Sequence, residues 1–509
     1  MLLHKLYENQ LIKTPNKEAI TFKGKSISYR ELDRSIKRSA RALINFGINR
    51  GDRVALFMNN CVELIELYFA CFKTGSIAVP LNHRYQTDEV IYATDHCKAK
   101  ILIADSDLFP RIRDIQNSLP SVQGIYEAGP ESKNGQDSWN FVLNDAPIEV
   151  DWPIVDKNDP AMILYTSGST NKPKGVTHTH SSIFNTCISR KITQGLDEDD
   201  VSLVATAICH AGGSIGNTFP ILYAGGTAVI LETADAAVFL ECVKLYRPSR
   251  ALLLPAQLLD IVEHPKAQKV DFGSLREVET GGDQVSHDLY DHFKRVTGFE
   301  LSQLYGLTEC EGGCLTPLSK PIKRGSIGLP RHGVEIRLVN DQGKDVQIGE
   351  SGEILIRSDT QMIGYWNDPH NTEKTLVDGW LKTGDIARRD DEGYYYFMGR
   401  IKEIIIKGGS NIAPGEVEEV LDDHPSVIIS GVVGTPHPRY GELVHAFVEL
   451  QPGLDNPPGE DELKSYALKR LAAYKVPDRW TFVEVLPRNE IGKIDRRGLH
   501  VLAAKLDSK

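Results

Sequence analysis

The sequence contains no long hydrophobic run, although 41% of its 509 residues are hydrophobic. A helix that crosses a bilayer needs about 20 consecutive apolar residues, and no stretch approaches that length. The N-terminal stretch MLLHKLYENQLIKTPNKEAI alternates acidic and basic side chains and is too polar for a secretory signal. We therefore expect no membrane span and a cytoplasmic location.

Cysteine is scarce, with eight residues in the whole chain. So few thiols in so long a chain do not form a disulfide framework, and we expect them to be free and mostly buried in a reducing compartment. Cys310 and Cys314 lie close together in sequence, but no second pair of Cys or His completes a zinc-binding pattern. The sequence therefore gives little support for a structural zinc.

The chain also lacks a basic block, and its formal net charge is −11. An acidic protein without a basic patch is a poor candidate for binding nucleic acid. Local lysines and backbone amides can still hold a small anionic ligand. With 25% charged residues over 509 positions, the composition is that of an ordinary globular protein with more than one domain.

Short apolar runs alternate with helical patterns through residues 30–150. DRVALFMNN predicts a buried strand, and CVELIELYFACFKTG predicts a helix that ends at Gly75. The same alternation returns at ALLLPAQLLDIVEH and SLREVETGG. Strands that alternate with helices favour parallel sheets with crossover helices, so the expected fold class is α/β.

After about residue 330 the pattern changes to period-2 alternation with Gly-containing turns, as in GVEIRLVNDQGKDVQIGESGEILIRS. This predicts antiparallel hairpins and a small β-barrel, and YYYFMGRIKEIIIKGG predicts a further hairpin. Pro414 and Glu416 favour a helix start. We place a domain boundary near Arg400, between a large N-terminal region of αβ-layered subdomains (1–399) and a small mobile α+β domain (400–509).

The stretch LYTSGSTNKPKGV, residues 164–176, follows an apolar run with a loop of hydroxyls, glycines and lysines. It is not a Walker-type phosphate loop, because Pro173 precedes Lys174 and the Lys-Gly order is reversed. Its side chains suit a clamp on a polyphosphate, although the residues alone leave a polar surface turn equally open. The loop groups are Thr166, Ser167, Gly168, Ser169, Thr170, Lys172 and Lys174.

This loop resembles the phosphate-binding signature of the adenylate-forming superfamily, which includes acyl-coenzyme A synthetases, peptide-synthetase adenylation domains and luciferases. Asn171 replaces the usual Gly, and Asn tolerates a positive φ better than other residues. Further motifs follow in the family's order and cover essentially the whole chain. They are HAGG (210–213), GGDQVS (281–286), QLYGLTE (303–309), GWLKTGD (379–385), GRIKEIIIKGGSNIAPGEVE (399–418) and PRNEIGKIDRR (487–497).

The resemblance implies an ATP/AMP site in which Tyr305 stacks on adenine, Asp385 accepts hydrogen bonds from the ribose hydroxyls, and Arg400 binds ribose or phosphate. The Gly281-Gly282 pair would let the backbone approach the base. The implied nucleotide-binding residues are Thr166, Ser167, Gly168, Ser169, Thr170, Lys174, Gly281, Gly282, Asp283, Gln303, Tyr305, Gly306, Thr308, Asp385, Arg400 and Lys493.

The resemblance also implies the catalytic groups. Glu309 would hold Mg²⁺, together with Thr166, because magnesium prefers few carboxylates beside phosphate oxygens. Lys493 would bridge the acid's carboxylate and the α-phosphate, where an ammonium stabilises the developing negative charge. Lys174 joins these three as a catalytic residue.

Three further roles follow from the resemblance. Lys402 would be the hinge between the domains, and Gly408 and Gly409 would flank a tunnel for coenzyme A. Small residues suggest a roomy acyl pocket. The implied pocket residues are His210, Gly213, Gly282, Gly306, Gly312 and Gly313.

The implied activity is an ATP-dependent acid–coenzyme A ligase that forms an acyl-AMP intermediate from a fatty or aryl acid. Its partners would be ATP, Mg²⁺, coenzyme A and the acid, in a monomer or homodimer. An enzyme that loads a carrier protein and a luciferase-type monooxygenase remain alternatives on the same scaffold. A catalytically dead binding protein is disfavoured by the intact Glu309, Asp385, Arg400 and Lys493.

Overall fold

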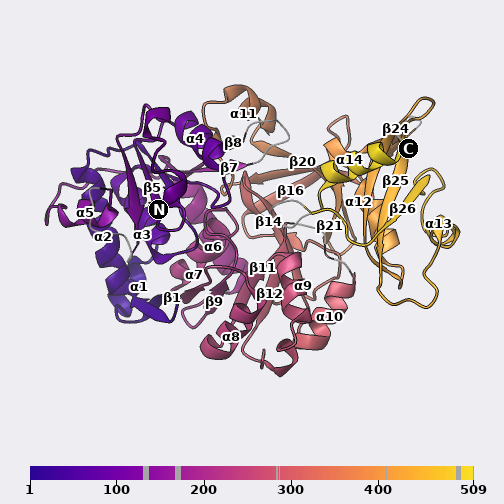
Figure 1. The fold of residues 1–509 in the computed structure, drawn as a ribbon, viewed down its shortest axis with the longest axis horizontal. Coiled ribbons are helices and arrows are strands. Elements are labelled where there is room, and N and C mark those ends of the chain that lie inside the picture. Colours follow the sequence, from indigo (N-terminus) through magenta and orange to yellow (C-terminus); the bar gives the residue numbers. More distant parts are fainter. Residues whose placement is uncertain are drawn as a thin grey trace.

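The structure is a computed structural model that describes residues 1–129, 137–166, 173–282, 285, 287–407, 410–488 and 494–507. Figure 1 shows a large region at the left and centre and a smaller, orange-to-yellow region at the right, which holds the C-terminus. The α/β architecture that the alternating pattern predicted is confirmed. The change from one sheet system to another falls after β21 (Tyr395–Arg400), beside the boundary that we predicted near Arg400.

A nine-stranded sheet, here called the large sheet, forms one layer of the large region. Its six central strands are parallel, and antiparallel strands close both edges. In spatial order the strands are β15 (Leu329–Pro330), β14 (Cys310–Leu315), β13 (Ser302–Leu307), β12 (Glu277–Gly281), β11 (Arg250–Leu253), β9 (Val201–Val204), β10 (Thr227–Ile230), β1 (Glu18–Phe22) and β2 (Lys25–Ser28).

A second, seven-stranded sheet lies against the first across a shared layer of helices. Its strands are, in order, β18 (Gly364–Tyr365), β8 (Lys174–Thr179), β7 (Pro160–Thr166), β4 (Ile77–Pro80), β3 (Arg53–Phe57), β5 (Ile101–Asp105) and β6 (Gly124–Ala128). The run at β3 and the helix ending at Gly75 lie where the sequence predicted them. Gly75 adopts φ 68° and caps α3 (Val62–Thr74) in the left-handed conformation that Gly tolerates best.

The main core lies between these two sheets. It joins strand residues such as Ile20 and Val54 to a central helical layer that includes α3. The other helices of this layer are α2 (Tyr29–Asn45), α5 (Trp139–Asn144), α6 (His180–Gln194) and α7 (Phe219–Ala224). Because alternate strand residues face opposite sides, each sheet has a second apolar face that another set of helices covers. These outer helices are α4 (Thr87–His96) on the second sheet and α8 (Ala236–Tyr246), α9 (Pro255–Glu263) and α10 (His287–Thr297) on the large sheet.

The segment after residue 330 forms the antiparallel hairpins that its period-2 pattern predicted. The strands are β16 (Val334–Val339), β17 (Gly352–Ser358), β20 (Trp380–Arg389), β19 (Leu376–Val377) and β21. No pairing between described residues joins β16 back to the far edge, but that edge is bridged through Tyr395 of β21 to Gly328 beside β15, so closure of the small barrel that we expected stays a prediction. The expected hairpin from Tyr394 to Gly409 is wrong in its described part, because β21 pairs with β20 whereas β22 (Ile405–Lys407) pairs in the next sheet.

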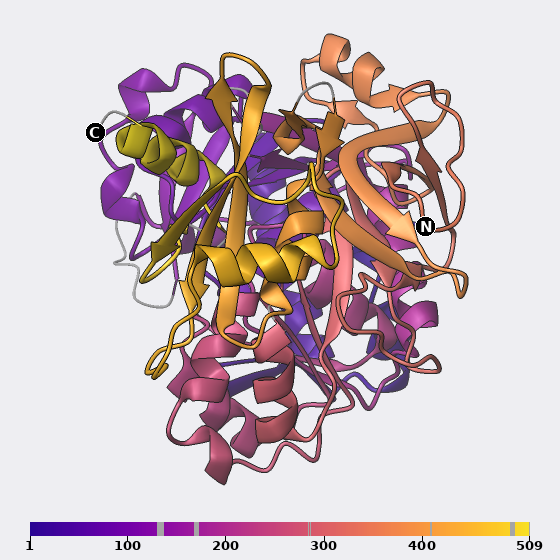
Figure 2. The same cartoon turned by 90° about the vertical axis from the view of Figure 1, so that its right-hand side faces the viewer.

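The C-terminal region is built on a sheet of its own. Its strands are β23 (Ser410–Ile412), β22, β25 (Gly441–Leu450), β24 (Val427–His437) and β26 (Arg479–Val483). The helices α12 (Pro414–Asp422) and α13 (Glu460–Leu468) cover one face, and α14 (Arg496–Asp507) covers the other. Pro414 occupies the first turn of α12, as its sequence position predicted. Figure 2, viewed from this side, shows the orange and yellow sheet and its helices in front of the large region.

Truncation of Phe219 tests the central helical layer. Its ring packs edge-on against Tyr68, Phe69 and Phe72 of α3, at centroid distances of 5.9, 5.4 and 5.8 Å. Because Phe219 is fully buried, we expect Phe219→Ala to lower the free energy of unfolding by about 3–5 kcal/mol in denaturant titrations. Phe141→Ala, at a side chain that is 56% exposed, should change it by less than about 0.5 kcal/mol. Equal losses in both variants would contradict this packing.

Candidate functional site

Three parallel strands bring the predicted site residues to one region. Thr166 ends β7, Gly281 ends β12, and the segment after β13 carries Thr308 and Glu309. Ligands of open α/β sheets bind outside the carboxyl ends of parallel strands, where loops of different strands converge. The site therefore joins Thr166 to two segments that lie more than 100 residues further along the chain.

Asp385 is held by two of the predicted nucleotide residues. The Tyr305 hydroxyl donates a hydrogen bond to Asp385 Oδ2 over 2.7 Å, and Arg400 Nε lies 3.0 Å from Oδ1. Asp385 and Arg400 are direct cross-strand partners on β20 and β21, while Tyr305 comes from β13 of the large sheet. Burial, and after it the Asp385 carboxylate, raises the pKa of Tyr305 well above its usual value, so the phenol stays a donor.

Glu309 and Lys174 meet at the ring of Tyr365. The Tyr365 hydroxyl donates to Glu309 Oε1 over 2.8 Å, and Lys174 Nζ lies 4.9 Å from the centre of the same ring. Burial and the Glu309 carboxylate raise the pKa of Tyr365. Lys174 begins β8 and pairs with Thr166 of β7, while Tyr365 pairs with Val176. One aromatic side chain thus places a carboxylate beside a cation.

His178 supports the segment that carries Glu309. Its Nε2 lies 2.7 Å from the carbonyl oxygen of Thr308, and its Nδ1 lies 3.2 Å from Ser182 Oγ. Because a carbonyl oxygen only accepts, Nε2 carries the proton in the neutral ring. Burial lowers the pKa of His178 to about 4, so the ring is neutral near pH 7.

The remaining predicted nucleotide residues lie around this centre. Gln303 on β13 accepts a hydrogen bond from the Tyr290 hydroxyl over 3.0 Å, and Gly282 adopts φ 84° directly after β12. Gly306 is exposed. Lys402 is exposed in the short helical turn Ile401–Glu403, and burial followed by the nearby cations Arg400 and Lys174 lowers its pKa. The predicted hinge lysine therefore lies within electrostatic range of the site.

Apart from Gly282 and Gly306, described above, the predicted acyl-pocket residues lie on two segments. His210, half-buried, and Gly213 precede the π-helical turn Ser214–Thr218, and a Cβ at Gly213 would collide with the carbonyl oxygen of Ala207. Gly312 and Gly313 lie on β14. The space that a side chain would fill at Gly313 is taken by the Tyr305 ring, and at Gly312 by the guanidinium of Arg331. Small residues at these two positions thus admit neighbouring side chains rather than leave open room.

Several predicted residues lie outside the described part of the chain, and their roles stay predictions. They are Ser167, Gly168, Ser169, Thr170, Asp283, Gly408, Gly409 and Lys493. Within the described ranges, no three His, Cys, Asp or Glu side chains gather as a metal cluster, and all eight cysteines are free thiols. No helix of these ranges is long and apolar enough to cross a membrane.

Comparisons with known proteins identify the family. A family model described as AMP-binding enzyme matches residues 7–366, and one described as AMP-binding enzyme C-terminal domain matches residues 416–493. The chain belongs to the AMP-binding enzyme family, so the adenylate-forming superfamily that the motifs predicted is confirmed.

Relatives of known activity extend over nearly the whole chain. The fatty acid–[acyl-carrier-protein] ligase ScoC of Streptomyces coeruleorubidus is 32% identical over 95% of this chain and 93% of its own length. The feruloyl-CoA synthase of an Amycolatopsis species is 33% identical, over 94% of this chain and 95% of its own. The anthranilate CoA ligase AuaEII, solved with anthranoyl-AMP, superposes with a TM-score of 0.90 at 28% identity, over 100% of this chain and 98% of its own. The chain is an AMP-forming ligase of the acyl-CoA synthetase class.

Two residues of this site, Tyr365 and His178, were not predicted from the sequence. Tyr365 lies 56 positions from Glu309, and His178 lies 130 positions from Thr308. Neither belongs to a motif that we recognised, and no local pattern shows which distant carboxylate or carbonyl a side chain will meet. Only the pairing of β18 with β8 and the packing of β8 beside Thr308 reveal their partners.

The pH dependence of stability tests the neutral state of His178. Its folded pKa of about 4 is below the value of about 6.5 in an unfolded chain, so the unfolded state binds more protons as the pH falls. The contribution of His178 to the free energy of unfolding is therefore fully present above pH 6.5. It declines by about 3 kcal/mol as the pH falls towards 4. Denaturant titrations of His178→Gln should lack that part of the decline.

His180→Gln is the matched control for the shape of this curve. His180 is equally buried and its pKa is also lowered to about 4, mainly by burial, but its ring does not contact Thr308. Both variants should flatten the pH profile, whereas only His178→Gln should also weaken ATP binding. If the stability of both variants falls with decreasing pH as steeply as that of the parent protein, the two buried histidines are not held neutral.

Proposed function

We propose that the protein is an ATP-dependent acid–coenzyme A ligase. It activates a carboxylic acid, fatty or aryl, as an acyl-AMP and transfers the acyl group to the thiol of coenzyme A. The observation that carries this proposal is the convergence of Tyr305, Asp385 and Arg400 beside the Glu309–Tyr365–Lys174 group. The relatives named above, which include CoA ligases of two aryl acids, support it.

Asp385 is suited to hold a ribose. Its Oδ2 accepts a hydrogen bond from Tyr305 and its Oδ1 is ion-paired with Arg400, but each carboxylate oxygen has two lone-pair positions, so both can still accept a ribose hydroxyl. The Tyr305 ring is fixed on one side by Gly313. In the proposed reaction these groups orient the nucleotide so that its α-phosphate faces the acid.

Glu309 and Thr166 fit the needs of Mg²⁺. The Glu309 carboxylate and the Thr166 hydroxyl would hold the ion, which would supply positive charge against the phosphates. In this chain Tyr365 fixes one oxygen of Glu309, and the backbone amide of Met362 donates to the Glu309 carbonyl over 2.7 Å. Lys174 supplies a second positive charge on the same side.

The proposed reaction has two halves. The acid's carboxylate oxygen attacks the α-phosphorus of ATP, the α–β phosphoanhydride bond breaks, and pyrophosphate leaves with its electron pair. Lys493 stabilises the charge that gathers between the two anions. The small domain then turns about Lys402, the thiol of coenzyme A loses its proton and attacks the acyl carbonyl, and AMP leaves.

A carrier protein is the second candidate acceptor, because the relative ScoC is named for acyl-carrier-protein loading. Release of pyrophosphate from ATP with a panel of acids, with and without coenzyme A, tests the proposal. A thioester of coenzyme A is the expected product. Pyrophosphate release that gives no thioester with coenzyme A, but acylates a carrier protein, would replace the acceptor.

Substitution of Lys493 separates the two halves of the reaction. We expect Lys493→Ala to slow acyl-AMP formation at least about 100-fold, because a charge-stabilising group of the transition state is lost. Thioester formation from supplied acyl-AMP should stay near the parent rate. The control Lys464→Ala, at an exposed lysine of α13, should change neither rate. Equal losses in both half-reactions would remove Lys493 from its proposed role.

Tyr365→Phe tests whether Tyr365 positions Glu309 for magnesium. Loss of the hydroxyl should raise the Mg²⁺ concentration for half-maximal activity about 10-fold, as expected when a partner of a metal ligand is removed. Saturating Mg²⁺ should restore most of the rate, a response that a merely structural loss would not give. Tyr126→Phe, on β6 at the opposite edge of the same sheet, is the control. An unchanged Mg²⁺ titration in Tyr365→Phe would refute this role.

A further inference from the structure

Four charged side chains form a buried cluster, here called the ion layer: Arg190, Glu279, Glu311 and Arg331. Arg190 Nη1 lies 2.7 Å from Glu279 Oε2, and Arg190 Nη2 lies 3.9 Å from Glu311 Oε1. Arg331 Nη1 lies 3.4 Å from the second Glu311 oxygen. Both arginine side chains are only 2% exposed. The layer joins α6, β12, β14 and the segment before β16.

The ion layer lies directly beyond the residues predicted for the acyl pocket. Glu279 is two residues before Gly281 on β12, so the two face the same side of the strand, about 7 Å apart. A Cβ at Gly312 would collide with the guanidinium of Arg331, and a Cβ at Gly216 would collide with Glu311. Gly216 follows Gly213 by one turn. The predicted pocket and the layer therefore adjoin each other along β12 and β14.

The layer has more hydrogen-bond donors than acceptors. Arg190 Nε and Nη2 and Arg331 Nε are buried without a hydrogen-bond partner. A buried guanidinium offers five N–H groups, and donors left without acceptors are costly. Burial lowers the pKa of Arg331, because Glu311 compensates its desolvation only in part. The cluster is therefore incomplete in a way that an oxygen atom of a ligand or a water would correct.

The charges of the layer are balanced, with two arginines and two glutamates. A further carboxylate buried against it would lack a counter-charge, at a cost of several kcal/mol. A neutral oxygen, as in a hydroxyl or keto group, accepts the same hydrogen bonds without adding a charge. The donors thus match a neutral acceptor better than a second acid group.

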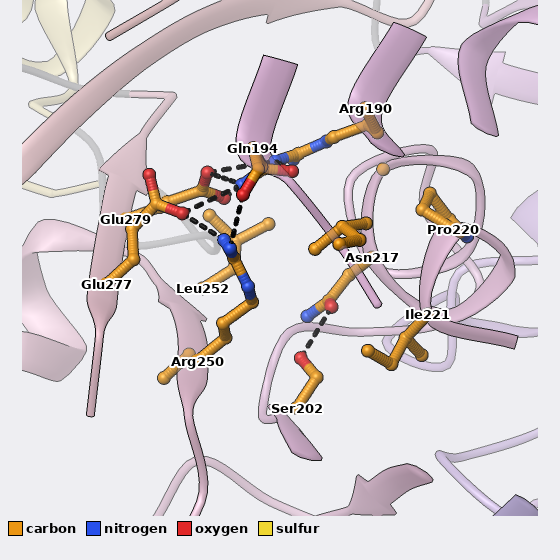
Figure 3. A pocket seen from close by; sticks show the side chains of 13 residues that line it. Arg190, Gln194, Ser202, Asn217, Pro220, Ile221, Arg250, Leu252, Glu277 and Glu279 are labelled. Atoms are coloured by element: carbon orange, nitrogen blue, oxygen red, sulfur yellow. Dashed lines mark hydrogen bonds and ion pairs between the residues drawn. The ribbon is translucent and has the colours of Figure 1, made fainter. Parts of the chain in front are cut away.

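A small cavity lies next to the layer. Its volume is about 20 Å³, and Arg190 and Glu279 line it together with Arg250 and Glu277. Figure 3 shows these four side chains converging with Gln194, and Asn217 and Ser202 hydrogen-bonded nearby. The space holds about one water molecule. Because Arg190 and Glu279 belong both to the layer and to the cavity wall, removal of this ion pair would open the layer towards the cavity.

We propose that the ion layer is the floor of the acyl pocket and selects a short acid, about one aromatic ring in length, whose far end carries a neutral oxygen that accepts a hydrogen bond from Arg190 or Arg331. This inference rests on the ligase function proposed above and narrows its fatty or aryl acid to a short, oxygen-substituted one. Long-chain acids are excluded because methylene groups would press against paired charges that they cannot solvate.

Initial rates of pyrophosphate release and thioester formation with matched acids test the proposal. The panel contains 3- and 4-hydroxybenzoate, 3- and 4-methylbenzoate, terephthalate and dodecanoate. At one ring position we expect kcat/KM for the hydroxyl compound to exceed that for its methyl counterpart at least about 10-fold, because the methyl group leaves the donors unpaired. Dodecanoate should be at least about 100-fold poorer than the best acid.

Two variants test the role of the layer itself. Arg190→Met with Glu279→Leu removes a whole ion pair, so neither partner is left as an uncompensated charge. It should join the pocket to the cavity, abolish the hydroxyl preference and improve kcat/KM for aliphatic acids such as octanoate about 10-fold or more. Arg190→Lys keeps the charge but loses Nε and Nη2 as donors, and should reduce the hydroxyl preference without the gain for octanoate.

Arg250→Met with Glu277→Leu is the matched control. Glu277 shares β12 with Glu279 and Arg250 lies on the neighbouring strand β11, and the pair is as deeply buried and borders the cavity without belonging to the layer. It should leave the ratio of kcat/KM between the hydroxyl and methyl compounds unchanged. Thermal melts show whether each variant folds. If the double variant of the layer does not fold, Arg190→Lys alone tests the role of the layer.

The outcomes separate this inference from the function on which it rests. A best rate with dodecanoate, with terephthalate or with the methyl compounds overturns the ion layer as a selective floor while the ligase stands. An unchanged ratio of kcat/KM between the hydroxyl and methyl compounds in both layer variants also overturns the selective floor. No pyrophosphate release and no thioester with any acid would overturn the ligase function and this inference together. Pyrophosphate release with the expected preference, but no coenzyme A thioester, would overturn only the acceptor.

Discussion

The site depends on the contacts that the buried carboxylate of Asp385 makes with two other residues. Asp385 is 3% exposed and joins Tyr305 from the large sheet to Arg400 from the last strand before the C-terminal region. A buried carboxylate is stable only when its oxygens are hydrogen-bonded or ion-paired. Because its two partners come from different sheets, the relative placement of these sheets and the burial of the Asp385 carboxylate require each other. The same contacts put the aromatic ring, the carboxylate and the guanidinium where a nucleotide would need them.

Charged side chains are buried to different extents in the Glu309–Lys174 group and in the ion layer. Around Glu309 and Lys174 the groups are half-buried and share one ring, so substrate phosphates and a cation can still reach them. In the ion layer, by contrast, four charges are almost fully removed from water and compensate one another. Buried ion pairs contribute little net stability over an apolar replacement. Their presence at the end of a predicted substrate pocket therefore points to recognition rather than to stability.

Much of the fold followed from local patterns. The helix that ends at Gly75 and the helix that begins at Pro414 lie where capping residues placed them, because a cap acts on the adjacent turn alone. The hairpin expected after Tyr394 was wrong, because distant segments decide which strand a given strand pairs with. Period-2 alternation shows that a strand is half-buried but not which strand it pairs with. Likewise, small residues at Gly312 and Gly313 suggested open space that Arg331 and Tyr305 fill.

The sequence by itself determined the order of elements and the family, since the motifs from Thr166 to Lys493 are contiguous signatures that need no partner to be recognised. Only the tertiary structure decided that Tyr365 meets Glu309, that His178 supports Thr308 and that Arg190 faces Glu279. These contacts span 56 to 130 residues and depend on sheet register and helix packing. A side chain's chemistry is local, whereas its partner is set by which distant backbone the fold brings within about 3 Å.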